Sequence, residues 1–85
     1  MYIVKKCLSG ESKSFNTFEE CADFIKKEVE QMTYDLYESD SIDKYAVEDI
    51  LFAIEDYIKK DNGYSHPDIP EEWEIEQVKE VPHDA

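Results

Sequence analysis

A stripe of apolar residues between positions 18 and 36 is the feature that most limits how this chain can fold. Its members recur at intervals of three and four, and they are Phe18, Cys21, Ile25, Val29, Met32 and Leu36. At 100° per residue this spacing puts them on one side of an α-helix, which must face a core. Thr17 and Glu20 stand just before it with the spacing of a capping box. We expect a helix over residues 18–37.

A second apolar stripe follows and predicts a second helix over residues 42–60. Its members are Val47, Ile50, Leu51, Ile54 and Ile58. Ser39, Asp40 and Ser41 are candidate N-caps for this helix. Lys59 and Lys60 complement the helix dipole in the last turn, and the sequence DNG supplies a left-handed residue after it.

Strands are predicted on both sides of the two helices. The segment YIVKKCL is rich in β-forming residues, and it is followed by the turn SGES and by KSFN, which can return as a second strand within residues 2–16. After a loop over residues 61–71, Trp73 and Ile75 alternate with glutamates, which predicts a strand over 72–81 that bulges or ends near Gln77. Residues 82–85 are expected to fray.

These elements predict a single domain of the α+β class. The N-terminal hairpin and the C-terminal strand would form a small antiparallel or mixed sheet, packed by two antiparallel helices. A chain of 85 residues supports one core. With six Tyr, four Phe, one Trp and 41% hydrophobic residues, the chain is too apolar for a disordered acidic tail.

The charge is strongly negative and unevenly distributed. The 22 acidic residues face nine basic ones, for a net charge of −13. Residues 1–27 carry five Lys against four acids, whereas residues 28–85 carry four Lys against eighteen acids. Every basic residue is Lys, so the planar fork with which Arg binds phosphate is absent. We expect no direct binding to nucleic acid or to an anionic membrane.

The sequence also argues against membrane insertion and secretion. No apolar run approaches the roughly 20 residues that span a bilayer. The start, MYIVKKCLSGES, lacks a basic segment followed by a long apolar one, as a secretion signal would have. We expect a cytoplasmic protein.

No motif predicts catalysis, a metal or a cofactor. Cys7 and Cys21 are expected to be reduced, partly buried thiols. With His66 and His83 they would make four zinc ligands, but no two have the close spacing of structural zinc sites. Ser65 and His66 lack a nucleophile elbow, and carboxylate pairs among 22 acids cannot nominate a general acid. We expect a protein that is not an enzyme.

Aromatic residues fall among the acids on the sides of both helices that face away from the core. With Ile25 at the centre of the first stripe, Tyr34 lies about 180° away. On the second helix, Tyr45 and Phe52 lie at about 140° to 160° from Val47, with carboxylates around them. The predicted partner-binding residues are Glu30, Tyr34, Tyr37, Glu38, Asp40, Asp43, Tyr45, Glu48, Asp49, Phe52, Glu55 and Asp56.

Other interpretations of this surface stay open. A run of charge on a helix is usually a solvated face, and Tyr45 and Phe52 could be covered by the 62–72 loop or by a second copy in a homodimer. The combination of scarce lysines with interleaved aromatics favours a contact surface.

Carboxylates on successive helical turns lie about 5.4 Å apart along the axis, close enough to phosphate spacing for a basic DNA-binding groove to accept them.

The layout YIVKKCLSGESKSFNTFEECADFI…WEIEQV, a strand, a turn, a capped helix and a late tryptophan strand, resembles the small acidic proteins that bacteriophages use against host machinery. The resemblance rests on layout and charge over most of the chain, with no diagnostic motif. It implies a host-takeover or counter-defence inhibitor of the DNA-mimic type, which acts in the cytoplasm of a bacterial host.

Targets of such proteins include the histone-like nucleoid protein HU, restriction enzymes, CRISPR effectors and uracil-DNA glycosylase. We favour HU, and the last target is disfavoured because the chain does not match the inhibitors of that enzyme. The alternative is an inhibitor or adaptor that grips a partner unrelated to nucleic acid through Tyr45 and Phe52.

Overall fold

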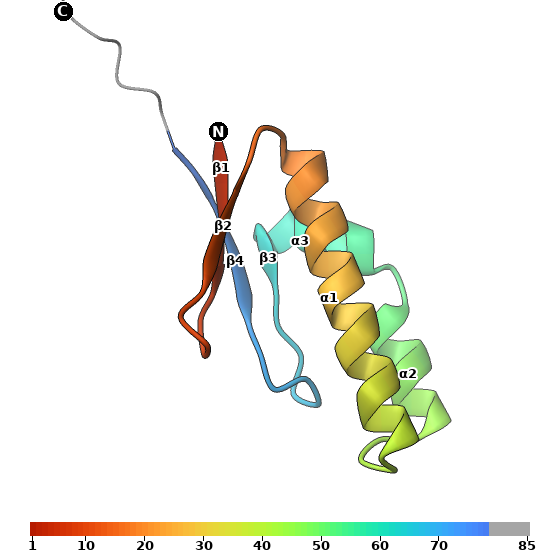
Figure 1. The fold of residues 1–85 in the computed structure, drawn as a ribbon. Helices are drawn as coiled ribbons and strands as arrows, with labels where there is room; N and C mark the ends of the chain where they lie inside the picture. Colours follow the sequence, from red (N-terminus) through yellow and green to blue (C-terminus); the bar gives the residue numbers. More distant parts are fainter. Residues whose placement is uncertain (79–85) are drawn as a thin grey trace, which may run out of the picture.

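Strand β1 (Tyr2–Lys6) lies inside an antiparallel sheet in the computed structural model, which describes residues 1–78. Its neighbours are β2 (Ser12–Phe15) on one side and β4 (Trp73–Gln77) on the other, and β3 (Gly63–Tyr64) completes the order β2-β1-β4-β3. Helices cover one face of this sheet (Figure 1). The predicted hairpin, C-terminal strand and α+β class are confirmed.

The prediction of a loop over residues 61–71 is wrong at Gly63 and Tyr64, which form strand β3. Two residues are too few to show an alternation in sequence, and the pairing depends on a backbone contact instead. A Cβ atom on Gly63 would lie 2.2 Å from the carbonyl oxygen of Trp73, so only glycine lets these two strands approach.

Strand β4 ends at Gln77, as the slipped alternation predicts. The rest of the predicted strand, residues 79–81, and the predicted tail 82–85 lie outside the described residues.

Helix α1 (Phe18–Glu38) begins at the predicted cap. The Glu20 amide donates to the Thr17 hydroxyl oxygen at 3.2 Å. The Glu20 carboxylate accepts from that same hydroxyl at 3.1 Å, rather than reaching the Thr17 backbone as a full capping box would. The middle of the α1 stripe is buried, and its first and last members are partly buried against the core. Thr33 is buried beside it and donates its hydroxyl to the Val29 carbonyl at 2.6 Å.

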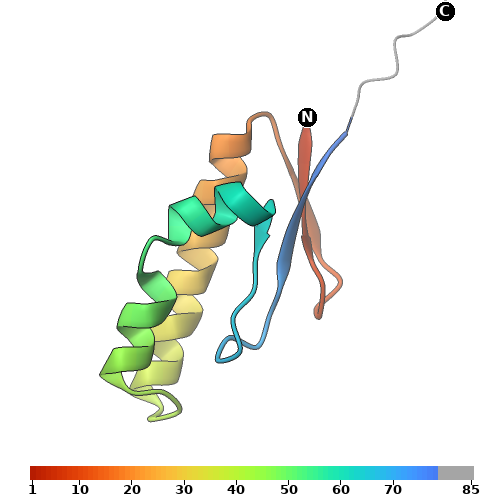
Figure 2. The same cartoon turned by 180° about the vertical axis from the view of Figure 1, so that it is seen from behind.

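The predicted second helix is in fact two helices, α2 (Lys44–Leu51) and α3 (Ile54–Asp61). Between them Ala53 adopts a left-handed conformation with φ of 49°, which ends α2. Figure 2 shows α2 alongside the second half of α1, and α3 turning across its first half toward β3. The break therefore redirects one continuous apolar stripe, a change of direction that periodicity does not encode.

The ends of α2 and α3 are capped locally. Asp43 caps α2 by accepting from the Ala46 amide at 2.9 Å, so the predicted caps Ser39, Asp40 and Ser41 are wrong. Asn62, in the left-handed conformation with φ of 52°, ends α3 as the DNG sequence predicts.

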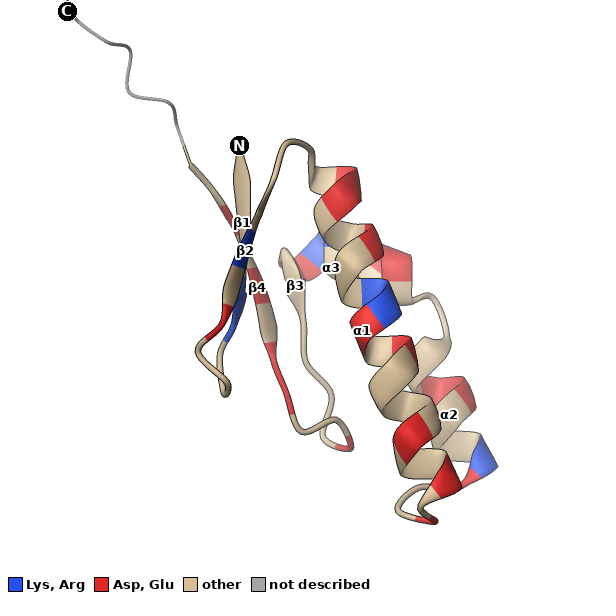
Figure 3. Cartoon of the chain, viewed as in Figure 1, with Lys and Arg blue, Asp and Glu red and all other residues tan. Residues whose placement is uncertain are grey.

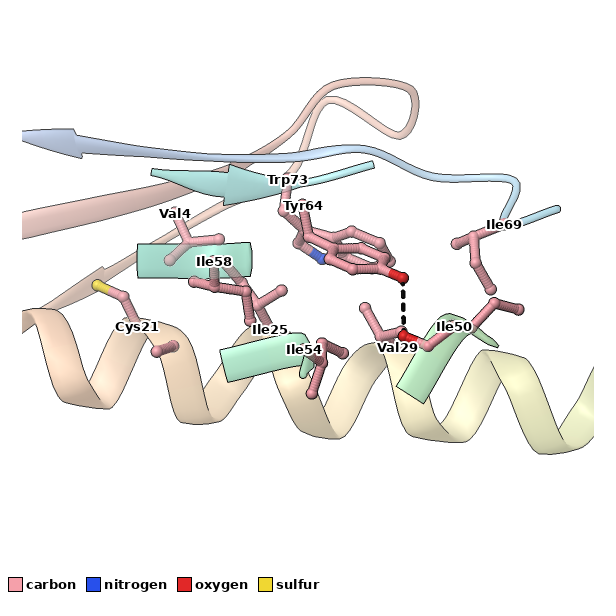
Figure 4. Close-up of a cluster of buried hydrophobic side chains, with 11 residues drawn as sticks. Val4, Cys21, Ile25, Val29, Ile50, Ile54, Ile58, Tyr64, Ile69 and Trp73 are labelled. Carbon is pink, nitrogen blue, oxygen red and sulfur yellow. Dashed lines mark hydrogen bonds between the residues drawn. The ribbon is translucent and has the colours of Figure 1, made fainter. Parts of the chain in front are cut away.

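The helices and the sheet share one apolar core, shown in Figure 4. Its buried side chains are Val4, Cys21, Ala22, Ile25, Val29, Ile50, Ile54, Ile58, Tyr64, Ile69 and Trp73. The Tyr64 hydroxyl donates to the Ile50 carbonyl at 3.0 Å, near the end of α2. Burial raises the pKa of Tyr64 to about 12, so this hydroxyl keeps its proton, and can donate, well into the alkaline range.

The two cysteines are free. Cys21 lies in the core, but Cys7 is exposed, so the prediction that both are partly buried is wrong for Cys7. Cys7 follows the last residue of β1, where no helix covers it.

Glu71 is a buried carboxylate, 4% exposed, that joins the hairpin turn to the segment before β4. It accepts from the backbone amides of Leu8 at 2.8 Å and Ser9 at 3.1 Å. Burial alone would raise the pKa of Glu71, but hydrogen bonds from the Leu8, Glu72 and Ser9 amides outweigh it and leave that pKa lowered. Glu71 therefore stabilises the hairpin as an anion.

Replacing Gly63 with alanine should lower the free energy of unfolding by about 3 kcal/mol, because the new methyl group collides with the Trp73 backbone. Chemical denaturation measures this loss. Gly10→Ala is the control: unlike Gly63, Gly10 has a positive φ, and because the space around its Cβ position is open, this variant should cost only about 1 kcal/mol of backbone strain. Equal losses for the two variants would contradict the close contact.

The variant Glu71→Gln should lose about 1–3 kcal/mol of stability at neutral pH, because the backbone amides of Leu8, Ser9 and Glu72 lose a charged, partly buried acceptor. The folded pKa lies below the ordinary 4.5, so this stabilisation is complete above that value and disappears as the pH falls through the folded pKa. Thermal melts across acidic pH measure it. Glu72→Gln, an exposed neighbour with the same change of charge, should melt like wild type, and equal losses in both variants would disprove the assignment.

Candidate protein-binding surface

Most of the predicted site lies at the end of the molecule formed by the second half of α1 and by α2. We call residues 30–56 the acidic end: the second half of α1, the turn after it, α2 and the first turn of α3. Its carboxylates are Glu30, Asp35, Glu38, Asp40, Asp43, Glu48, Asp49, Glu55 and Asp56. The single lysine among them is Lys44, so the nine acids carry a net charge of −8 (Figure 3).

The other described lysines lie nearer the sheet, where most of them pair with acids. The ion pairs are Lys5 with Glu76, Lys6 with Glu28 and Glu11, Lys26 with Glu55, and Lys27 with Asp23. Lys13 lies over the rings of Phe15 and Phe24. The acidic end therefore has nine acids and one lysine, whereas the rest of residues 1–78 has eleven acids and seven lysines (Figure 3).

Two of the predicted site carboxylates do not stand free. Lys26 donates to Glu55 at 2.8 Å, and this hydrogen bond holds the pKa of Glu55 below its ordinary value. His66 Nε2 lies 3.1 Å from Asp49 Oδ2. Ion pairs within residues 1–78 involve no other predicted site acid, which leaves Glu30, Glu38, Asp40, Asp43, Glu48 and Asp56. Of these, Asp43 also serves as the cap of α2.

The four predicted aromatic residues all face solvent. Phe52 is 81% exposed, Tyr45 79%, Tyr34 50% and Tyr37 44%. The outward directions calculated from the helical period are confirmed. The 62–72 loop does not cover Tyr45 or Phe52, so that alternative is wrong. Cover by a second copy of the chain remains the other alternative.

Helix α2 aligns two of these aromatics with two carboxylates. Tyr45, Glu48, Asp49 and Phe52 are separated by three, four and seven positions, which places them along one side of a helix. We call these four residues the α2 stripe. The Phe52 amide donates to the Glu48 carbonyl at 2.9 Å, so Phe52 keeps its helical position at the C-cap. The left-handed turn at Ala53 then leads the chain away and leaves Phe52 at an outer corner.

One hollow in the surface reaches the acidic end at Glu55, where Ala22 and Lys59 also line it, and others lie outside that end. The one between the sheet and α1, with a volume of about 260 Å³, is lined by Val4, Lys6, Glu11, Ser12, Lys13, Phe24 and Glu28. Lys6 already pairs with Glu28 and Glu11 at its wall. Nowhere in residues 1–78 do three His, Cys, Asp or Glu side chains form a group that could hold a metal ion.

Comparisons with protein-family models, with curated proteins and with solved structures gave no match for this chain. The resemblance to phage inhibitors thus stays a prediction.

Among the helices of residues 1–78, none combines the length and apolar character needed to cross a membrane.

Because Phe52 lies outside the core, Phe52→Ser should change the free energy of unfolding by no more than about 0.5 kcal/mol. Ile50→Ala, two positions earlier in the buried core, should cost about 2–5 kcal/mol. Urea denaturation of the two variants compares them directly. A large loss for Phe52→Ser at low protein concentration would mean that Phe52 is covered in the folded protein.

Proposed function

We propose that the protein is a binding protein without enzymatic activity, which occupies the DNA-binding surface of a basic protein in the bacterial cytoplasm. The observation that carries this proposal is the uneven distribution of charge: nine carboxylates share the acidic end with Lys44 alone, whereas the rest of residues 1–78 has eleven acids and seven lysines, four of them in ion pairs. A coat of solubilising charge would need no such separation, because interspersed lysines and acids solubilise equally well.

Electrostatics explains how such a surface would compete with DNA. Proteins bind duplex DNA largely through Lys and Arg contacts to phosphates, which release counterions. Carboxylates held on helices in the acidic end would present a fixed array of anions to the same Lys and Arg side chains. Association would then be fast and would weaken with added salt. A small basic nucleoid protein of the HU type is the first target to test, followed by restriction enzymes and CRISPR effectors.

The exposed aromatics favour a second candidate function. Tyr45 and Phe52 present apolar surface at the outer corner of the fold, and large aromatic side chains are common anchors of protein interfaces. An inhibitor or adaptor could use them to bind a partner that does not bind nucleic acid. Salt distinguishes the two functions, because a DNA mimic loses affinity steeply as salt rises and an apolar clamp hardly responds.

The triple variant Glu38→Lys, Glu48→Lys and Asp56→Lys should lose about tenfold or more of its ability to release a labelled DNA duplex from HU. These acids have no ion pair among the described residues, so their reversal leaves the Lys26–Glu55 pair intact. Fluorescence anisotropy of the duplex measures the competition, and circular dichroism checks the fold.

The matched control reverses three exposed acids outside the acidic end, Glu19→Lys, Glu72→Lys and Glu74→Lys, with the same change in net charge. It should compete nearly as well as wild type. Equal loss in both triple variants would mean that total charge matters rather than its position. No release of DNA by the wild-type protein from any basic DNA-binding protein would refute the proposed function.

A further inference from the structure

The α2 stripe orders aromatic and acidic groups in a specific way. Tyr45 and Phe52 are the two most exposed large apolar side chains within residues 1–78, and they lie seven positions apart on α2. Asp49 stands four positions after Tyr45, and Phe52 four positions after Glu48. Side chains four apart on a helix are neighbours. The stripe therefore contains two adjacent pairs, each made of one aromatic ring and one carboxylate.

We propose that the α2 stripe binds arginine side chains of the partner in preference to lysine side chains. This inference rests on the proposed function, which supplies a basic partner. A guanidinium group is planar and weakly hydrated, so it can stack on an aromatic ring while its N–H groups donate to a carboxylate beside that ring. An ammonium group is a strongly hydrated point charge without a stacking face. A ring paired with a carboxylate thus suits arginine.

The spacing fits two guanidinium groups. Seven residues of helix rise by about 10.5 Å, so the rings of Tyr45 and Phe52 are attached far enough apart to serve one arginine each. Glu48 has no ion pair among the described residues, and Asp49 Oδ2 is oriented by His66 Nε2 at 3.1 Å. Both carboxylates are solvent-exposed and can accept from a partner.

The backbone holds the stripe in place before any partner arrives. The left-handed Ala53 ends α2 directly after Phe52, and the Tyr64 hydroxyl fixes the last turn through the Ile50 carbonyl. A preorganised backbone loses less conformational freedom on binding.

Charge complementarity favours this occupant over a second copy of the chain. Two acidic ends brought face to face would each bring a net charge of −8, and like charges across an interface oppose association. A partner with arginines supplies the missing positive charge.

The test titrates the isotope-labelled full chain with two synthetic peptides of equal length, oligo-arginine and oligo-lysine, and follows the amide signals of α2 by NMR. The arginine peptide should bind about two- to fivefold more tightly, as a cation–π contact at an exposed site predicts. The variant Tyr45→Leu with Phe52→Leu keeps apolar groups but removes both rings, and it should abolish the preference by weakening only the arginine peptide. Tyr57→Leu, an exposed aromatic on α3 that lies outside the acidic end and whose ring packs against Tyr64, should keep the preference.

Two results would overturn the inference: equal affinity for both peptides, or an arginine preference that survives the loss of both rings. With either result, the proposed function would still stand if the wild-type chain releases DNA from a basic protein. Conversely, a ring-dependent arginine preference without any release of DNA would support the α2 stripe and refute the proposed function.

Discussion

The break between α2 and α3 is the constraint on which the arrangement of this protein depends. Ala53 takes a left-handed conformation there, which costs on the order of 1 kcal/mol for a residue with a side chain. Burial of Ile54 and Ile58 on one side and the Tyr64 hydroxyl on the Ile50 carbonyl on the other offset that cost. Because of the break, α3 crosses α1, brings Lys26 to Glu55, and leads the chain into β3.

The same break sorts the charges and the aromatics. Once α3 turns toward the sheet, its last lysines, Lys59 and Lys60, end beside β3, and α2 remains at the outside with Lys44 as its one basic residue. Most ion pairs of the lysines thus lie near the sheet, whereas the acidic end keeps its carboxylates together against their mutual repulsion. A binding partner with positive charge would relieve that repulsion, which is why we connect this end with function.

Much of this fold could be predicted from sequence, because local rules determine it. The α1 stripe, the Thr17 cap, the hairpin and the end of β4 near Gln77 follow from periodicity and turn chemistry. The outward directions of Tyr34, Tyr45 and Phe52 follow from the same helical geometry. The role of these residues in binding stays a prediction.

Features that depend on contacts distant in sequence could not be predicted. Strand β3 exists because Gly63 lies directly against the Trp73 backbone. Glu71 is buried because the hairpin turn supplies amide donors. Lys26 reaches Glu55 only because the chain changes direction at Ala53.

The central claim is that the fold concentrates negative potential at residues 30–56. NMR paramagnetic relaxation by small cationic and anionic nitroxides measures this potential at each amide. The cationic probe should be strongly enriched over the anionic one at residues 30–56 and only weakly at the sheet, whereas a uniform ratio over the whole surface would contradict the claim.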